Sequence, residues 1–122
     1  MSKQSFSPVH RRAIWEAHKH KCFYCSTPLK WDDIRIDHVV PEHLNDKPEE
    51  RKKVLLSIGL DEGWSLNEDH NLVPSCNPCN SQKGGQVYPE QQLIHLLNRI
   101  KDKPVSRHPQ WDKLRELHNR GF

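Results

Sequence analysis

Four cysteines in two closely spaced pairs are the residues with the clearest chemical potential in this sequence. Cys22 and Cys25 form one C-x-x-C, and Cys76 and Cys79 form the other. Two such pairs can supply the four thiolates of a tetrahedral zinc site, because each short turn presents both of its sulfurs to one ion. A redox pair or free thiols would be the alternative, which a second matched pair disfavours. We therefore predict a structural zinc ion with no coordination position left for a substrate.

A second group of polar side chains lies between the two pairs, in the stretch RIDHVVPEHLND, residues 35–46. Asp37 and His38 interrupt an apolar run whose alternation predicts a strand, and Pro41 should end that strand. A carboxylate can bind a divalent cation, and an imidazole can take a proton from water. Neighbours on a strand point to opposite faces, so alternation alone leaves open whether the two residues share a site. A lone histidine in such a strand is more often structural.

Further polar residues accompany the second cysteine pair. Asn71 begins the apolar segment NLVPSC, Asn80 directly follows Cys79, and Lys83 lies one helical turn later. The ammonium of Lys83 could act as a point charge on a phosphate. A solvated lysine at a helix end is an equally good interpretation of that residue.

The order of these motifs resembles the zinc-containing branch of the HNH endonucleases. It reads C-x-x-C, D-H-x-x-P, N-L and C-x-x-C-N-x-x-K between residues 22 and 83. The joint occurrence in this order is far more specific than any one motif. The resemblance implies an α+β fold with a ββα-metal core, also called a His-Me finger, in which two antiparallel strands and a helix grip one divalent cation. In this chain a four-cysteine zinc site would staple that core, and helices would flank it.

The resemblance also implies a role for each matched residue. Asp37 and Asn80 would bind the catalytic cation, and His38 would be the general base that activates water. Asn71 would brace the loop and orient His38 through backbone contacts, and Lys83 would add charge beside the nucleic acid. Many members carry histidine where Asn80 stands, and the oxygen ligand favours Mg2+ or Mn2+.

The activity implied is hydrolysis of phosphodiester bonds in DNA, by nicking or by double-strand cleavage. One active-site set cuts one strand at a time, so a double-strand break would need a homodimer or two events. Besides DNA, a phage or restriction protein is a candidate partner. An RNA nuclease is an alternative, and so is a non-catalytic zinc-stabilised DNA-binding or assembly module. Uneven charge motivates the module: Lys/Arg against Asp/Glu are seven to three in residues 1–35, four to nine in 36–82, and eight to four in 83–122.

Five helices are predicted around and within the motifs. Their approximate ranges are 8–19, 47–58, 89–102 and 109–119, and a helix of about two turns begins beside Pro78 and ends at the glycines 84 and 85. Ser7, Asp46 and Asn77 are the expected N-caps of the first, second and shortest of these helices. On the helix at 89–102, we expect Leu93, Ile94, Leu97 and Ile100 to form the apolar face.

Residues 42–68 separate His38 from Asn71 more widely than a compact member would need, and they resemble an insertion with its own helix. This segment could cover the substrate or dock a partner. Its amphipathic pattern favours packing instead, through Leu44, Val54, Leu55 and Ile58. No motif assigns a role to Glu42, His43 or His70, for which we expect surface or supporting positions.

The chain as a whole predicts one domain over residues 1–122, since 122 residues are typical of a single domain. Apolar residues make up 34% and charged residues 29%, so a small core should need a metal staple. The sequence has neither an apolar run of membrane length nor the apolar core of a secretory signal. We therefore expect a soluble cytoplasmic protein without a membrane partner, where paired cysteines bind metal more often than they form disulfides.

Overall fold

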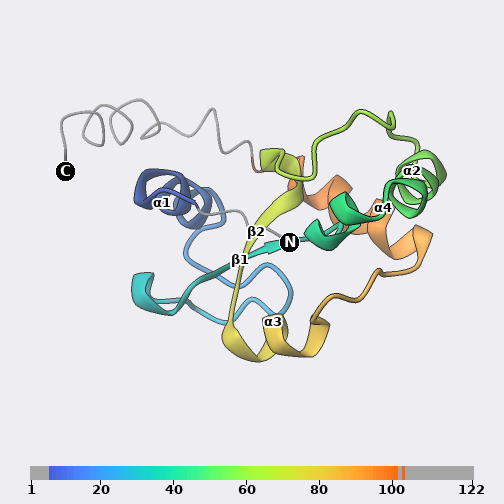
Figure 1. The fold of residues 1–122 in the computed structure, drawn as a ribbon. Coiled ribbons are helices and arrows are strands. Elements are labelled where there is room, and N and C mark those ends of the chain that lie inside the picture. Colours follow the sequence, from blue (N-terminus) through green and yellow to red (C-terminus); the bar gives the residue numbers. More distant parts are fainter. Residues whose placement is uncertain (1–5, 102, 104–122) are drawn as a thin grey trace.

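The computed structural model describes residues 6–101 and 103, which form a small α+β fold (Figure 1). The predicted helix at 109–119 lies outside these residues. The helices and strands follow the order α1 (Pro8–Ala17), β1 (Arg35–His38), α2 (Pro48–Ser57), β2 (Leu72–Ser75), α3 (Asn77–Lys83) and α4 (Glu90–Ile100). Three short 3-10 helices join them: η1 (Trp31–Asp33), η2 (Glu42–Asp46) and η3 (Asp69–Asn71).

The two strands form an antiparallel pair at the centre of the fold (Figure 1). Asp37 lies opposite Val73 and His38 lies opposite Leu72. Helix α1 contacts β2, while α3 turns back from the end of β2 to contact β1. The residues of α3 therefore lie beside the strand that carries Asp37 and His38.

Helix α1 begins as predicted and ends two residues earlier than expected. The Ser7 side chain accepts a hydrogen bond from the backbone N–H of His10 at 3.1 Å, which is the contact of an N-cap. The helix stops at Ala17 because Lys19 and His20 adopt left-handed backbone conformations, with φ of 58° and 62°.

Two predicted caps are wrong by one residue, although the helices that they were meant to begin are present. Asp46 ends η2, and Lys47 takes the N-cap position of α2 without a side-chain bond. Cys76 takes the cap position of α3, so Asn77 lies inside the helix. In both places the element before the helix, η2 or β2, sets the boundary in place of the capping side chain.

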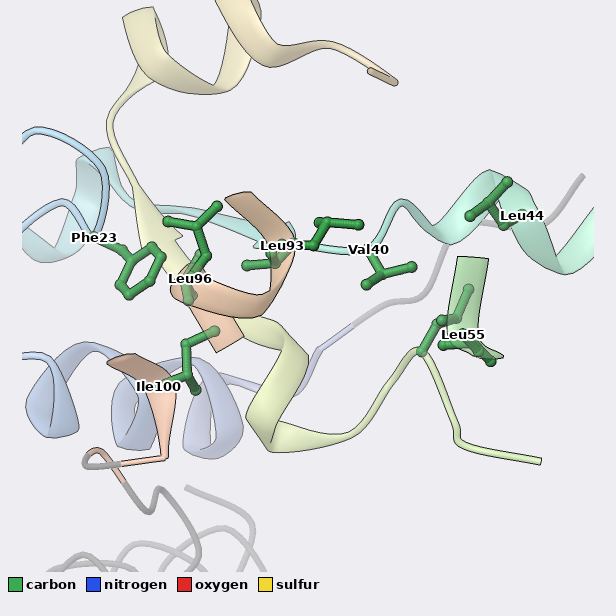
Figure 2. Packing of buried hydrophobic residues seen from close by; sticks show 10 residues of the cluster. Phe23, Val40, Leu44, Leu55, Leu93, Leu96 and Ile100 are labelled. Atoms are coloured by element: carbon green, nitrogen blue, oxygen red, sulfur yellow. The ribbon is translucent and has the colours of Figure 1, made fainter. Parts of the chain in front are cut away.

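The main core forms where the 42–68 segment and α4 meet the sheet (Figure 2). Leu44 and Leu55 of the segment are almost completely buried, with Val54 and Ile58 partly buried against them, so the packing interpretation of this segment is confirmed. The buried members of this cluster are Phe23, Val39, Val40, Leu44, Leu55, Leu66, Val73, Leu93, Leu96 and Ile100.

Helix α4 packs on this core with a face slightly rotated from the predicted one. Leu93 and Ile100 are buried as expected, but Leu96 is buried as well, and Ile94 is 37% exposed. The spacing 93, 96, 100 satisfies the helical repeat better than a stripe through residue 94. None of the helices in the described part of the chain is long and apolar enough to span a bilayer.

Candidate functional site

The sulfur cluster consists of Cys22, Cys25, Cys76 and Cys79, whose Sγ atoms all lie within 4.8 Å of one another. The Sγ atoms of Cys25 and Cys76 are 3.7 Å apart. Four sulfurs at about 2.3 Å from a tetrahedral zinc would be about 3.8 Å from each other, so the spacing suits that ion. The two predicted pairs therefore come together, and the cluster can hold a metal ion such as zinc.

A tight turn presents the first pair of thiols. The N–H of Cys22 donates to the carbonyl of Thr27 at 2.8 Å, and the N–H of Ser26 donates to the carbonyl of Cys22 at 2.9 Å. Ser26 itself has a φ of 65°. Burial raises the pKa of the Cys22 thiol, so a bound cation is needed to favour its thiolate.

A polar pocket of about 290 Å³ lies at the end of β1, where that strand meets α3. Asp37 and His38 line it from β1, and Asn80 and Lys83 line it from α3. Although Asp37 and His38 are neighbours on a strand, both reach this pocket, which answers the question that the alternation left open. The remaining lining residues are Phe6, Ile36, Pro41, Glu42, His43, Gly84 and Gly85.

Asp37 is buried and held by two donors. Its Oδ2 accepts a hydrogen bond from the phenol of Tyr24 and lies 3.4 Å from Nζ of Lys83. Burial, and then the Asp37 carboxylate, raise the pKa of Tyr24 far above its usual value, so the phenol remains a donor. The Asp37 side chain is therefore fixed in direction by Tyr24 and Lys83.

Lys83 is only 4% exposed, so its interpretation as a solvated lysine is wrong. Its Nζ donates to the carbonyl of His38 at 2.8 Å as well as facing Asp37. Burial lowers the pKa of Lys83, and the Asp37 charge opposes that shift. The ammonium is thus engaged inside the fold, and it would have to leave Asp37 to reach a phosphate.

His38 lies among polar residues supplied by the 42–68 segment. Its Nε2 is 2.8 Å from Oδ1 of Asn67 and 3.7 Å from Oε2 of Glu42. The ring also contacts Phe6, with centroids 5.9 Å apart. The segment that packs on the core therefore also contributes two side chains to the surroundings of the imidazole.

Asn71 is completely buried and forms hydrogen bonds to the backbone that follows β1. Its Oδ1 accepts from the N–H of Val40 at 2.8 Å, and its Nδ2 donates to the carbonyls of Val40 at 3.0 Å and Leu66 at 2.8 Å. The backbone carbonyl of Asn71 accepts from the N–H of Val39 at 2.9 Å. These bonds fix the loop beside His38, and Asn71 does not line the pocket.

The three residues without an assigned role differ in position. Glu42 and His43 are half-buried and line the pocket, whereas His70 is exposed and does not. His43 Nε2 lies 2.7 Å from the carbonyl of Gly85, and a Cβ on Gly85 would meet the His43 ring at 3.2 Å. The glycine after α3 therefore leaves room for the His43 ring of η2.

The sequence patterns did not identify Tyr24 or Asn67, although both contact a predicted site residue. The position of Tyr24 between Cys22 and Cys25 could have indicated a role, because the position of a residue inside that turn depends on the position of the two sulfurs. No sequence pattern indicated Asn67, since its contact with His38 joins two residues separated by most of the 42–68 segment. Tyr88 was also missed, and its ring centroid lies 5.6 Å from Nζ of Lys83.

Chemistry is the guide to function here, because no family model, curated protein or solved structure matches the chain. The sulfur cluster offers four soft thiolate ligands. The pocket offers a carboxylate and an amide oxygen beside an imidazole. Thiolates suit zinc, whereas the pocket presents oxygen donors, so the two groups of side chains differ in chemistry.

Proposed function

We propose that this chain is a metal-dependent endonuclease with an HNH-type ββα-metal site, which hydrolyses phosphodiester bonds in DNA. The observation that carries the proposal is the meeting of Asp37, His38 and Asn80 in one pocket, from a strand and a helix separated by about forty residues of sequence. Two antiparallel strands followed by a short helix supply the support. A purely structural zinc module has no need for a buried carboxylate, an imidazole and an amide oxygen together.

His38 is the proposed general base. The contact between Nε2 and Oδ1 of Asn67 favours the tautomer with its proton on Nε2. That tautomer leaves Nδ1 as a proton acceptor, so the imidazole can take a proton from the attacking water. Asn67 thus orients the base in the way that a third residue orients a catalytic histidine.

Asp37 and Asn80 are the proposed ligands of the divalent cation. Each carboxylate oxygen has two acceptor positions, and Tyr24 and Lys83 leave part of that capacity unused. The side-chain oxygen of Asn80 is a hard donor of the kind that magnesium and manganese accept. When bound, the cation would supply Lewis-acid stabilisation of the phosphate charge.

A plasmid-nicking assay with Mg2+ or Mn2+ tests the proposal. We expect the parent to cut and His38→Ala to cut at least about 100-fold more slowly, because general-base catalysis contributes about 10²- to 10⁴-fold. His70→Ala is the matched control, since His70 is an exposed histidine outside the pocket. Equal rates for the parent and His38→Ala would refute the assignment of the base.

The same preparation distinguishes the other candidate functions. Parallel digestion of single-stranded RNA and DNA identifies the substrate sugar. Salt-sensitive binding of DNA with no cutting under either cation would favour the non-catalytic module instead. We expect cutting of DNA, with binding that weakens as salt is raised.

A further inference from the structure

Tyr24 lies inside the first cysteine pair and also touches Asp37, so it belongs to both sites at once. Its phenol donates a hydrogen bond to Oδ2 of Asp37. Its backbone is one residue from Cys25 and two from Cys22. Among the described residues, no other side chain from between the cysteines of either pair makes a hydrogen bond to Asp37.

The turn that carries the thiols fixes the position of the Tyr24 ring. The preceding residue, Phe23, donates its N–H to the carbonyl of Pro74 at 2.9 Å, which ties the turn to β2. The rings of Phe23 and Tyr24 meet edge to face, with centroids 5.3 Å apart. Tyr24 is partly buried against both the main core and the apolar cluster around the sulfurs. A change in the turn would therefore move the phenol.

The hydrogen bonds on Asp37 restrict which of its oxygens can meet a cation. Tyr24 binds Oδ2, and Lys83 approaches Oδ2 at 3.4 Å and Oδ1 at 3.5 Å. Oδ1 thus has the larger unused acceptor capacity. With Tyr24 absent, the carboxylate could rotate about its last bond, and Lys83 alone would not select one oxygen.

We infer that Tyr24 is a positioning residue that links the sulfur cluster to the cation site at Asp37. This inference rests on the proposed function, because it takes Asp37 as a cation ligand. The phenol occupies Oδ2, which leaves Oδ1 as the oxygen with more acceptor capacity for a cation. The ion in the sulfur cluster therefore supports binding of the second, harder cation through one side chain.

The test compares Tyr24→Phe with Tyr88→Phe. Both changes remove one phenol oxygen and keep the ring, and both tyrosines lie beside Lys83, but only Tyr24 bonds to Asp37. Titration calorimetry with MnCl2, without nucleic acid, measures the affinity of the pocket. We expect Tyr24→Phe to weaken Mn2+ binding by about 10- to 100-fold, which is typical for loss of a residue that orients a ligand. Tyr88→Phe should match the parent.

Zinc content by elemental analysis and the cleavage rate as a function of Mn2+ complete the experiment. Tyr24→Phe should keep its zinc and need more Mn2+ for half-maximal cleavage, with a smaller change in the rate at saturation. Equal Mn2+ affinity in Tyr24→Phe and the parent would overturn this inference and leave the nuclease proposal standing. Loss of zinc from Tyr24→Phe would assign Tyr24 to the sulfur cluster alone and also overturn it. A parent that neither binds Mn2+ nor cuts DNA would overturn both.

Discussion

The sulfur cluster and the polar pocket hold their side chains in different ways. The cluster brings four identical donors together from a turn and a helix start. In the pocket, Tyr24 and Lys83 hold the Asp37 side chain, and Asn67 holds His38. We expect a metal ion to stabilise the first arrangement, whereas hydrogen bonds hold Asp37 and His38 in the second.

This difference indicates how each site should respond to metal removal and to substitution. Without a cation the four sulfurs lack a shared partner, and burial raises the pKa of the Cys22 thiol, which disfavours its thiolate. The buried pair of Lys83 and Asp37 should persist without any ion. Metal removal should therefore destabilise the protein through the sulfur cluster, whereas the pocket should lose stability only when one of its own side chains is replaced.

Cys76→Ser should have the largest effect, because it removes one of the four sulfurs that would hold the zinc ion. Structural zinc contributes about 10 to 16 kcal/mol in small zinc peptides, and a whole domain is stable by only about 5 to 15 kcal/mol. We expect the variant to lose zinc and its cooperative thermal transition, measured by elemental analysis and circular dichroism. Ser81→Ala, on the exposed side of α3, is the control. A variant that unfolds at the parent temperature would show that the cluster is not a staple.

Lys83→Met should destabilise the protein by about 3 to 5 kcal/mol, because it leaves the Asp37 charge buried without its partner. Urea unfolding in a buffer without chelator, so that zinc is retained, measures this loss. Lys53→Met, at an exposed lysine on α2, should change stability by less than about 0.5 kcal/mol. Adding Asp37→Asn to Lys83→Met should recover part of the loss. Equal stability of the two lysine variants would mean that the pocket is not held by this pair.

Asn71→Ala should cost about 3 to 4 kcal/mol, since it leaves the N–H and carbonyl of Val40 without their partner. Urea unfolding measures the loss, and Asn98→Ala on the exposed face of α4 serves as control. The zinc content should remain that of the parent. Release of zinc by Asn71→Ala would show that the loop after β1 also holds the sulfur cluster together.

Lowering the pH should reduce the free energy of unfolding by a smaller amount through His18, whose ring contacts Phe23 of the thiol-bearing turn. Burial, and then the charges of Lys103 and Arg99, lower the pKa of His18 to about 4. His18 binds a proton more readily in the unfolded chain than in the folded one. The stability that neutral His18 contributes is therefore fully present above the usual pKa of 6.5 and is lost as pH falls toward 4. The loss is at most about 3 kcal/mol. His18→Leu should flatten the dependence of the unfolding free energy on pH between 6.5 and 4, whereas His95→Leu, at an exposed position, should not.

The sulfur cluster was predictable from sequence because its chemistry requires residues of one type at a fixed short spacing. The first strand and the helices within the described residues were also predictable, from apolar periodicity and helix start and stop signals. The second strand followed only from the motif resemblance. The predicted N-caps at Asp46 and Asn77 were wrong, because a preceding 3-10 helix or strand set the boundary of the helix. Local sequence does not contain that information.

The pocket was predictable only in part. Its lining residues Asp37, His38 and Asn80 came from motif order, and the structure brings them together. The partners that orient them, Tyr24 and Asn67, depend on contacts between distant segments. Lys83 was placed on the correct helix, but its burial depends on how α3 packs against β1, which no spacing along the chain reveals.

The hydrogen bond from Phe23 to Pro74 has a consequence for solubility. A sheet of two strands has two open edges, and an open edge can pair with another chain and start aggregation. On β2, the thiol-bearing turn covers part of that edge through Phe23, and Pro74 has no N–H to offer there. Loss of zinc would loosen this cover, so the metal would protect the protein from self-association as well as from unfolding.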